Sequence, residues 1–297
     1  MLKPPLQPML LKTVDKPFNS EDHLFEFKWD GFRTILFIIN GKIYLQSRNG
    51  KDLTPSFQEL KKLSKYIDSD NIVLDGEICY FNSDNESRFS ILQKRLQSNS
   101  KELRNKYPVT YITWDILATN DTYTYNKPLK IRKNILKNMI NSRNNLLQIS
   151  PEIFKDGEKL YKTADKNNFE GIVAKKIDSV YEFKRSDNWK KIKIWNYKDV
   201  YIGGYTREKT AFLVGEKIKN KNKLKYLGKV KSALVSEQRE ALFNFLPELE
   251  IKQSPFINPP VENNICWVKP HISSRIKYNE LTPDNHFRHG YITELNL

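Results

Sequence analysis

Short runs of β-branched, aromatic and other apolar residues recur through the first two thirds of the chain, and they limit the possible folds more than any other feature. Turns with Gly, Asn, Asp or Pro separate these runs, which are FEFKWDGF, TILFII, KIYLQS, NIVLDGEICYF, VTYITWDIL, FEGIVAKKI and WKKIKIW. Two helical stripes lie between them, one formed by Phe57, Leu60, Leu63 and Ile67 and one within 135–140. This mixture predicts an α+β fold rather than a doubly wound sheet.

The pattern of predicted strands and turns changes near residue 197. The runs DVYIGGYT, AFLVGEKI and LKYLGKVK indicate short strands with glycine turns, followed by a helix near 236–246 and a proline-rich tail. A segment of this length suits a small β-barrel. We therefore expect two domains, 1–197 and 198–297, in a chain long enough to bury a core in each.

The charge balance predicts a polyanionic partner. Lys and Arg number 50 against 35 Asp and Glu, so the formal net charge is +15, which favours DNA, RNA or an anionic membrane. No apolar run approaches the roughly 18 residues of a membrane span, and prolines interrupt MLKPPLQPML where a signal peptide would be apolar. We expect a soluble, cytoplasmic protein, nucleoid-associated if bacterial. Cys79, Cys266 and the four histidines show no zinc or disulfide pattern.

Charged residues stand at alternate positions inside several apolar runs. Residues two apart in a strand share a face. The pairs that would share a face are Lys28 with Asp30, if FEFKWDGFR is one strand, Asp75 with Glu77, and Lys191 with Lys193. Their neighbours Leu74, Ile78, Ile192 and Ile194 would face a core, and Glu170 stands at the mouth of a further apolar run.

Together these strands predict one sheet with an apolar face and a face lined by lysines and carboxylates. A solvated strand face is the alternative for any single pair, but several such strands in one domain favour a cleft. Phosphoryl chemistry needs cations for phosphates and carboxylates for a divalent metal. The pattern therefore indicates a site of phosphoryl transfer.

The segment KWDG at 28–31 resembles the nucleophile motif of covalent nucleotidyltransferases. Further segments match the motifs of that family in order and approximate spacing: Arg33, SRNG at 47–50, DGE at 75–77, EGIVAK at 170–175 and KIK at 191–193. More narrowly, SRNGKDLTP, RFSILQKRL and RSDNWKKIK resemble the ligase module of bacterial ATP-dependent DNA ligases of end joining (LigD-type). The resemblance implies a nucleotidyltransferase (ATP-grasp-like ligase) domain with antiparallel sheets, followed by an OB-fold β-barrel.

The resemblance also implies a role for each matching residue. Lys28 would be the nucleophile that takes AMP, Asp30 would orient its amine, and Lys191 and Lys193 would hold the ATP phosphates. The other nucleotide contacts would be Glu26, Arg33, Arg48, Glu77 on the sugar, Trp114 on the adenine, Glu170 and Arg185. Glu170 and Glu77 would bind the metal, and Arg33 and Arg48 would also contact DNA. The implied cofactors are ATP and Mg²⁺, with Mn²⁺ as an alternative.

Alternative readings apply to several of these residues. Trp114 would otherwise be ordinary core, and Arg33, Arg48 and Arg185 would be surface ion pairs. A free lysine has a pKa near 10.4, so the site must make the amine of Lys28 neutral. We expect Lys191, Lys193 and a bound metal to lower its pKa, whereas Asp30 opposes them.

The second domain carries a row of alternating lysines, Lys217, Lys219, Lys221, Lys223 and Lys225. In an extended segment they would share one side and face a phosphate backbone. A hairpin tip at Asn220 or Asn222 would split the row, and a lysine-protected edge strand is the alternative. HFRHGYI at 286–292 resembles the start of the family's final motif, with Arg288 as a DNA contact. The basic ending of that motif is absent from YITELNL, which predicts slow adenylylation of Lys28 or a substitute basic residue.

The resemblance leaves three functions open. The first is an ATP-dependent DNA ligase that seals nicked or broken double-stranded DNA in repair or end joining. The second is an RNA ligase or a capping-type guanylyltransferase, and the third is a non-catalytic nucleic-acid-binding module. NAD⁺ is disfavoured as adenylate donor because only 27 residues precede Lys28. Lacking room for polymerase or phosphoesterase domains, the chain is expected to act as a monomer recruited by a Ku-like end-binding protein.

Overall fold

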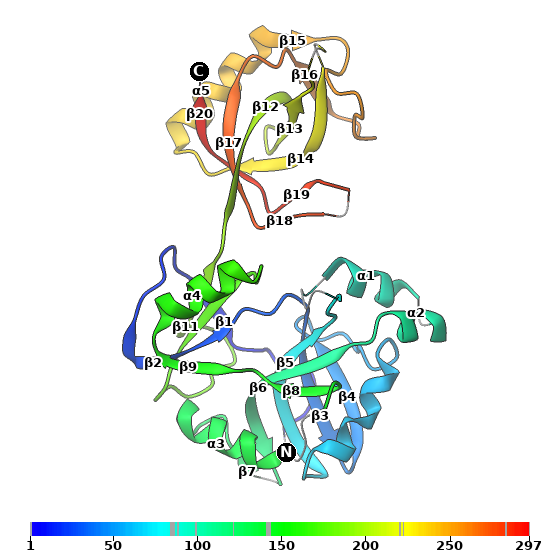
Figure 1. The fold of residues 1–297 in the computed structure, drawn as a ribbon, viewed down its shortest axis with the longest axis vertical. Helices are drawn as coiled ribbons and strands as arrows, with labels where there is room; N and C mark the ends of the chain where they lie inside the picture. The colour runs from blue at the N-terminus through cyan, green and yellow to red at the C-terminus, as the bar shows by residue number, and fades with distance from the viewer. Residues whose placement is uncertain are drawn as a thin grey trace. The chain divides into compact units, whose positions relative to one another are not determined.

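The chain folds into two compact units, the first ending at Ile194 and the second beginning at Trp195 (Figure 1). The sequence analysis places this boundary at residue 197. The computed structural model describes residues 2–83, 87, 89–98, 100–120, 122–140, 144–219, 221, 223–282 and 284–296. Within these ranges, the helices are too short or too polar to cross a membrane.

The first unit contains two mainly antiparallel sheets. The first sheet consists, in spatial order, of β1 (Leu10–Thr13), β11 (Arg185–Lys193), β10 (Gly171–Lys176), β2 (Ser20–Phe27) and β9 (Glu152–Lys155). The second sheet consists of β4 (Lys42–Ser47), β3 (Phe32–Ile39), β5 (Asn71–Cys79), β6 (Thr110–Thr119) and β7 (Thr122–Tyr123), with β8 (Leu147–Ile149) also paired to β6. The charged strands predicted to form one sheet therefore belong to two, and that prediction is wrong.

Alternation of side chains in the strands gives each sheet two buried faces. The inner faces share one core, to which the first sheet contributes Leu24 and Trp189 and the second contributes Ile35 and Val73. The outer face of the first sheet packs against α4 (Gly157–Lys166) through Phe25, Ile172 and Leu160. Charged residues at the inner faces consequently lie between the two sheets, out of bulk water.

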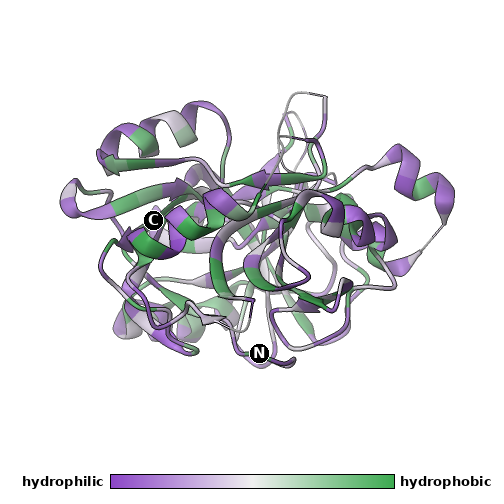
Figure 2. Ribbon diagram, turned by 90° about the horizontal axis from the view of Figure 1, so that it is seen from below, coloured by the Kyte–Doolittle hydropathy of each residue, from purple (hydrophilic) through white to green (hydrophobic). Residues whose placement is uncertain are grey.

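Three helices pack against the outer face of the second sheet: η1 (Gln58–Tyr66), α1 (Phe89–Gln97) and, through Leu136, α3 (Leu129–Met139). α2 (Lys101–Lys106) buries none of its residues. Leu60, Leu63 and Leu92 pack on that face against Leu36 and Leu74, which agrees with the stripe predicted for 57–67, although that segment is a 3₁₀ helix. Figure 2 shows hydrophobic and hydrophilic residues alternating along the helices, as one-sided burial requires.

The second unit is a closed barrel of five strands. Around the ring they are β12 (Asn196–Thr206), β13 (Phe212–Lys217), β14 (Leu224–Ser232), β20 (Tyr291–Asn296) and β17 (Ser273–Tyr278), which returns to β12. β14 and β20 run parallel, and the other neighbours in the ring are antiparallel. The remaining elements are α5 (Ser236–Phe245), η2 (Leu246–Leu249), β15 (Glu250–Ile251), β16 (Ile265–Val268), β18 (Glu280–Leu281) and β19 (Phe287–Arg288).

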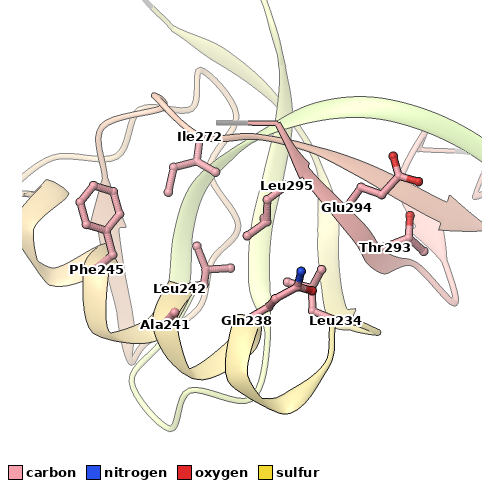
Figure 3. Close-up of a pocket in the computed structure, with 9 residues that line it drawn as sticks. All are labelled: Leu234, Gln238, Ala241, Leu242, Phe245, Ile272, Thr293, Glu294 and Leu295. Atoms are coloured by element: carbon pink, nitrogen blue, oxygen red, sulfur yellow. The ribbon is translucent and has the colours of Figure 1, made fainter.

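The barrel closes over an apolar interior that includes Val200, Phe212, Ile276 and Ile292. α5, predicted for 236–246, adds Leu242 and Phe243 to this core. A groove of about 560 Å³ runs between α5 and the end of β20 and is lined by residues such as Phe245, Ile272 and Leu295 (Figure 3). The five strands close into a ring, which confirms the predicted barrel. Every strand of the ring is paired on both sides, so neither edge of the sheet is left open.

Candidate active site

Strand pairing in the first sheet brings together three charged residues that are distant in sequence. β10 pairs with both β2 and β11, with Phe27 opposite Ile172 and Gly171 opposite Lys193. Lys28, which follows β2, and Glu170, which precedes β10, therefore reach the same end of the sheet as Lys193. The register of these strands, more than any loop, determines where the three side chains meet.

Lys28 and Asp30 do not lie in a strand, so the prediction that they share a strand face is wrong. β2 ends at Phe27, where the Lys28 backbone N–H donates to Gly171 O at 2.9 Å. Trp29 then turns into the core between the sheets, and its indole N–H donates to Ser150 Oγ at 3.0 Å. Gly31 passes so close to β5 that an added Cβ would lie 2.2 Å from Ile78 O. The buried tryptophan and the close glycine break the extended conformation.

Glu170 joins two lysines. Lys28 Nζ donates to Glu170 Oε2, and Lys193 Nζ lies 3.1 Å from Glu170 Oε1. The side chains of Lys28, Glu170 and Lys193 are 20%, 16% and 14% exposed, so solvent still reaches the cluster. Gly171 follows Glu170 with φ +148, a conformation that side chains rarely adopt, and an added Cβ would lie 2.1 Å from Ile192 O. The motif needs glycine here to place the carboxylate.

The carboxylates around Lys28 keep its amine protonated in the ligand-free protein. Burial lowers the pKa of Lys28, but the charges of Glu170, Glu77 and Asp30 together raise it above its usual value. The carboxylates thus oppose the lowering expected from Lys191, Lys193 and a bound metal, and that lowering stays a prediction. Burial raises the pKa of Glu170, yet the bonded Lys28 and Lys193 bring it to about 2.

Lys191 lies on the same face of β11 as Lys193. Burial, together with the charges of Lys28 and Lys193, lowers the pKa of Lys191. Ile192, between the two lysines, and Ile194 pack on the other side against α4. The predicted alternation of β11 is thus confirmed, and its lysines add positive charge beside Lys28.

Glu77 enters the site from the second sheet. Its Oε1 accepts a hydrogen bond from Gly31 N at 2.8 Å, which fixes the turn after Lys28. Burial raises the pKa of Glu77 to about 8, although the charges of Lys28 and Arg33 oppose this shift. The Glu77 carboxyl is therefore harder to ionise than a free one, and a further cation would favour its ionised form.

The carboxylates fit a magnesium ion only as part of a larger ligand set. Among the described residues, no three His, Cys, Asp or Glu side chains gather closely enough to hold a metal alone. Mg²⁺ usually binds one or two protein carboxylates and completes its shell with water and substrate phosphates. Glu170 and Glu77 match that pattern, so the donors present fit a metal that arrives with a nucleotide.

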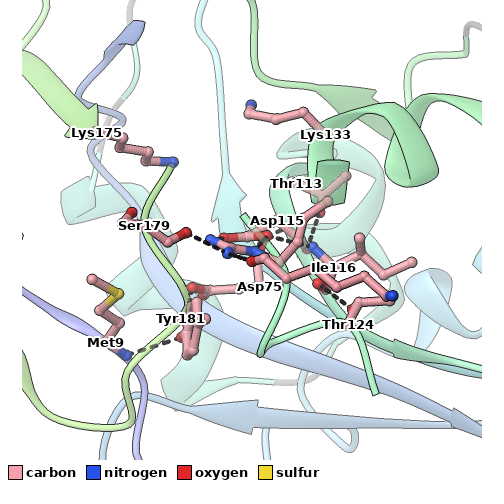
Figure 4. A network of polar contacts seen from close by, with 12 residues as sticks. Met9, Asp75, Thr113, Asp115, Ile116, Thr124, Lys133, Lys175, Ser179 and Tyr181 are labelled. Atoms are coloured by element: carbon pink, nitrogen blue, oxygen red, sulfur yellow. Dashed lines mark hydrogen bonds and ion pairs between the residues drawn. The ribbon is translucent and has the colours of Figure 1, made fainter. Parts of the chain in front are cut away.

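Arg33 belongs to a largely buried network around Asp75. Figure 4 shows Asp75, Tyr181 and Met9 of this network. Arg33 Nε and Nη2 donate to the two carboxylate oxygens of Asp75 at 2.8 and 2.6 Å. Tyr181 donates to Asp75 Oδ2 at 2.9 Å and accepts from Met9 N at 2.9 Å. Asp75 is completely buried. The predicted surface ion pair of Arg33 is therefore an internal one, which connects β3, β5 and the loop before β11.

Trp114 lies in the same core and is 7% exposed. The Arg33 guanidinium carbon and the Lys175 amine each lie 5.1 Å from its ring centroid. Cations over an indole face are attracted to its π electrons. The structure places the ring in the core, beside two cations. Its contact with adenine stays a prediction.

Glu26 is the centre of a buried cluster whose other members the sequence analysis missed. Lys175 Nζ donates to its Oε2 at 2.8 Å, and Lys133 Nζ donates to its Oε1. Lys133 also lies 2.8 Å from Glu152 Oε2. Burial, with the charge of Lys133, lowers the pKa of Lys175 to about 8. Two buried lysines thus surround the carboxylate two residues before Lys28.

The sequence contains a pattern that could have indicated the burial of Lys133. Leu129, Arg132, Lys133 and Leu136 are the buried residues of α3 and stand at the spacing i, i+3, i+4 and i+7. Arg132 is completely buried and donates to both oxygens of Asp115 at 2.7 and 2.9 Å. Its Nη1 donates to Ser179 O at 2.8 Å, within the network of Figure 4.

The remaining predicted residues of the first unit are exposed. Arg48 follows β4, and its backbone N–H donates to Arg33 O at 3.1 Å. Arg185 begins β11, and its Nη1 donates to Leu11 O at 2.5 Å. Neither side chain joins the Lys28 cluster through a contact that the structure shows. Their roles remain predictions.

The lysines of the second unit do not form one row. Lys217 ends β13, and Lys225 lies in β14 opposite Glu216, so a hairpin turn separates them. Lys221 N donates to Ile218 O at 3.1 Å within this turn, next to Lys219, and Lys223 donates to Ser254 O. The prediction of one extended lysine face is therefore wrong, as is the edge-strand alternative, because β13 pairs on both sides. The suggested tips, Asn220 and Asn222, lie outside the described residues.

Arg288 lies in the two-stranded ladder of β18 and β19, where its guanidinium forms an ion pair with Glu280. Its side chain is 25% exposed. An arginine already engaged by a carboxylate must break that pair to contact a phosphate. The predicted DNA contact of Arg288 remains a prediction.

The two-sheet unit with a lysine and carboxylate cluster, followed by a closed five-stranded barrel, has the architecture of a covalent nucleotidyltransferase with an OB-fold domain. Residues 8–193 match the model of the ATP-dependent DNA ligase domain, and 206–296 match that of the ATP-dependent DNA ligase C-terminal region. The chain belongs to the ATP-dependent DNA ligase family. This confirms the resemblance to that family.

Individual relatives agree with this assignment. The chain is 28% identical over 283 residues to the multifunctional non-homologous end joining protein LigD of Mycolicibacterium smegmatis, covering 91% of this chain and 35% of LigD. It is 33% identical over 210 residues to the SPbeta prophage-derived DNA ligase-like protein LigB of Bacillus subtilis, covering 70% of this chain and 75% of LigB. The chain therefore spans about a third of the length of the LigD relatives.

A solved structure supports the fold. The structure of mycobacterial DNA ligase D complexed with ATP and MES is 27% identical in sequence, with a TM-score of 0.59. The match covers 98% of this chain and 95% of that chain. It includes both units, so the predicted fold class is confirmed.

Proposed function

We propose that this chain joins a 5′-phosphate to a 3′-hydroxyl in double-stranded DNA through AMP bound covalently to Lys28. The carrying observation is the cluster in which Glu170 contacts both Lys28 and Lys193. It combines a nucleophile, phosphate-binding cations and a metal-binding carboxylate within one partly solvent-accessible group. An ion pair with a purely structural role would need only one lysine and one carboxylate.

The reaction consists of three transfers. The neutral amine of Lys28 attacks the α-phosphorus of ATP, forms a P–N bond and displaces pyrophosphate, while its proton passes to solvent or a nearby base. The 5′-phosphate oxygen at the break then attacks this AMP, which breaks the P–N bond. Finally, the 3′-hydroxyl attacks the activated 5′-phosphate, releases AMP and loses its proton. Each displacement depends mainly on positioning and charge neutralisation.

The predicted residues divide among these tasks. Lys191 and Lys193 would bind the phosphates of ATP, and the aromatic ring of Trp114 and the Glu26 cluster would bind the adenine. Arg33 would contact phosphate only in the orientation that its hydrogen bonds to Asp75 fix. Arg48 and Arg185 are exposed and would contact the DNA end or the nucleotide. The incomplete final motif around Arg288 would make adenylylation slow.

Glu170 and Glu77 would hold Mg²⁺, with Mn²⁺ as an alternative. When bound, the metal would neutralise charge on the phosphates and on these carboxylates. The carboxylates, which raise the pKa of Lys28 when they are free of metal, would then no longer stabilise its protonated amine. The raised pKa is therefore compatible with a neutral nucleophile in the reaction.

The biological substrate is a nick or a double-strand break. The likeness to LigD favours end joining, and the net charge of +15 favours a DNA partner over a neutral one. A Ku-like protein that binds DNA ends would recruit the ligase to a break. The broken DNA substrate and the Ku-like partner go beyond the family assignment.

One assay tests the proposed function directly. The protein is incubated with Mg²⁺ and ATP labelled at the α-phosphate, and the covalent adduct is measured. The adduct is then exposed to nicked DNA and nicked RNA in parallel. We expect labelled protein that loses its label only to DNA. Failure to form any adduct would reject the catalytic proposal, and discharge onto RNA alone would reject the substrate.

The rate of adduct formation is expected to rise with pH. Because the pKa of Lys28 is raised, the neutral amine is a minor species near pH 7 and increases by up to about tenfold per pH unit below that pKa. Initial rates between pH 6 and 9, at ATP concentrations well below saturation, report on the free protein and measure this slope. Discharge of a preformed adduct onto nicked DNA does not require the free amine and serves as the control. A rate of adduct formation that is flat or falls with pH would contradict the assignment of Lys28.

A further inference from the structure

An outer face of the barrel carries aromatic and basic side chains in adjacent strands. Tyr197 in β12 is opposite Lys277 in β17, and Lys277 is opposite Tyr291 in β20. Val200 and Ile276, at positions of opposite parity, point into the barrel core. The first three residues therefore form a row on the outside of the barrel.

The cations of this face lie over its rings. Lys277 Nζ is 5.1 Å from the Trp195 ring centroid and 6.0 Å from that of Tyr291, and the two rings meet edge to face at 6.2 Å. The Arg275 guanidinium lies 5.6 Å from the Tyr197 ring. Lys217 Nζ lies 3.9 Å from the ring of Tyr201, four residues after Tyr197 in β12. We call these seven residues the aromatic face.

Barrel stability alone does not account for this arrangement. The side chain of Tyr197 is 53% exposed, although it is among the larger apolar groups of the unit. Burial of such a ring would stabilise the fold, so its exposure indicates a surface that contacts something else. Its cation is also accessible, because Arg275 is exposed.

The charges of the face favour bases over a continuous phosphate backbone. Between the row of Tyr197 and that of Tyr201, Asp199 and Glu294 flank Arg275 across the strands. Two carboxylates in the middle of the face would repel the regularly spaced phosphates of a duplex. Unpaired bases can instead stack on the tyrosine rings while their phosphates lie beside Lys277 and Lys217.

We propose that the aromatic face binds unpaired nucleotides of a single-stranded DNA overhang. This proposal rests on the proposed function, because the overhang would belong to the broken end that the first unit seals. The face would hold the overhang by stacking, which tolerates any sequence. Binding would be tighter for a break with an overhang than for a nick of the same duplex.

The test measures binding of a fluorescent oligothymidine to the whole chain at fixed salt. Tyr197→Ala is expected to weaken binding about tenfold, which corresponds to the loss of one stacked base. Tyr197→Phe should bind like the unchanged protein, because stacking requires the ring and not the hydroxyl. Tyr123→Ala removes a tyrosine that is 42% exposed in the first unit and should leave binding unchanged.

The melting temperature and the Lys28 adduct are measured for each variant. If Tyr197→Ala folds and forms adduct normally but binds oligothymidine like the unchanged protein, the aromatic face has no role in binding and the proposal is overturned. The same result follows if the unchanged protein does not bind the oligomer. Loss of the adduct in the unchanged protein would instead reject the proposed function, so the two failures are distinguishable.

Discussion

Replacement of Lys28 by arginine is expected to abolish the covalent AMP adduct. Arginine keeps the positive charge that Glu170 contacts, but its guanidinium has a pKa far above that of a lysine amine and is almost never neutral. The variant therefore preserves the ion pair of the site while removing the nucleophile. We expect adduct formation to fall by at least about a thousandfold, measured as label retained on denatured protein.

Lys190→Arg provides the matched control for this variant. Lys190 precedes Lys191 in β11, and its amine lies 5.4 Å from the Phe18 ring, away from the Glu170 cluster. Adduct formation should be unchanged in this variant. The Lys28→Arg protein should still seal a nick whose 5′-phosphate already carries AMP, because that step does not use the amine. Adduct formation by Lys28→Arg near the normal rate would rule out Lys28 as the nucleophile.

The sequence predicts the components of this site better than their arrangement. Alternation of charged and apolar residues correctly assigns one face of β11 to Lys191 and Lys193 and the other to Ile192, because β11 is regular there. The same rule fails for Lys28 and Asp30, since burial of Trp29 ends the strand. Alternation of residues along a sequence does not show where the chain leaves a strand so that a side chain can pack into a core.

Buried charges are the second group that the sequence analysis misses. Lys133 and Lys175 belong to otherwise apolar patterns, and a lysine at such a position is ordinarily placed at a solvent-exposed edge. The pairing of β2 with β10 brings Lys175 within reach of Glu26, and the packing of α3 brings Lys133 there. Because hydrogen-bonded charges of opposite sign can share a dry core, composition alone does not reveal them.

The meeting of Lys28 with Glu170 depends on contacts between segments 142 residues apart. Family motifs imply that both belong to one site, whereas the bonds between them follow from strand register. The two carboxylates that raise the pKa of Lys28 most, those of Glu170 and Glu77, come from different sheets. A prediction of pKa from local sequence could therefore include Asp30 but not the larger contributions.

Replacement of Arg132 by methionine is expected to destabilise the first unit strongly. Arg132 and Asp115 are both completely buried, so the substitution would leave the Asp115 carboxylate without its cation in a dry core. Removal of one member of a buried pair typically costs about 3 to 5 kcal/mol. For a domain of this size, that corresponds to a melting temperature lower by about 6 to 20 °C.

Lys130→Met on the same helix is the matched control. Lys130 lies 2.7 Å from Asp178, but these side chains are 54% and 59% exposed, so the pair should contribute no more than about 1 kcal/mol. Calorimetry of the whole chain separates the transitions of the two units if they unfold independently. A first-unit transition in Arg132→Met within about 2 °C of the unchanged protein would show that Asp115 does not need Arg132. A large fall in the melting temperature that occurs only in Arg132→Met would show that the Arg132–Asp115 pair contributes strongly to the stability of the first unit.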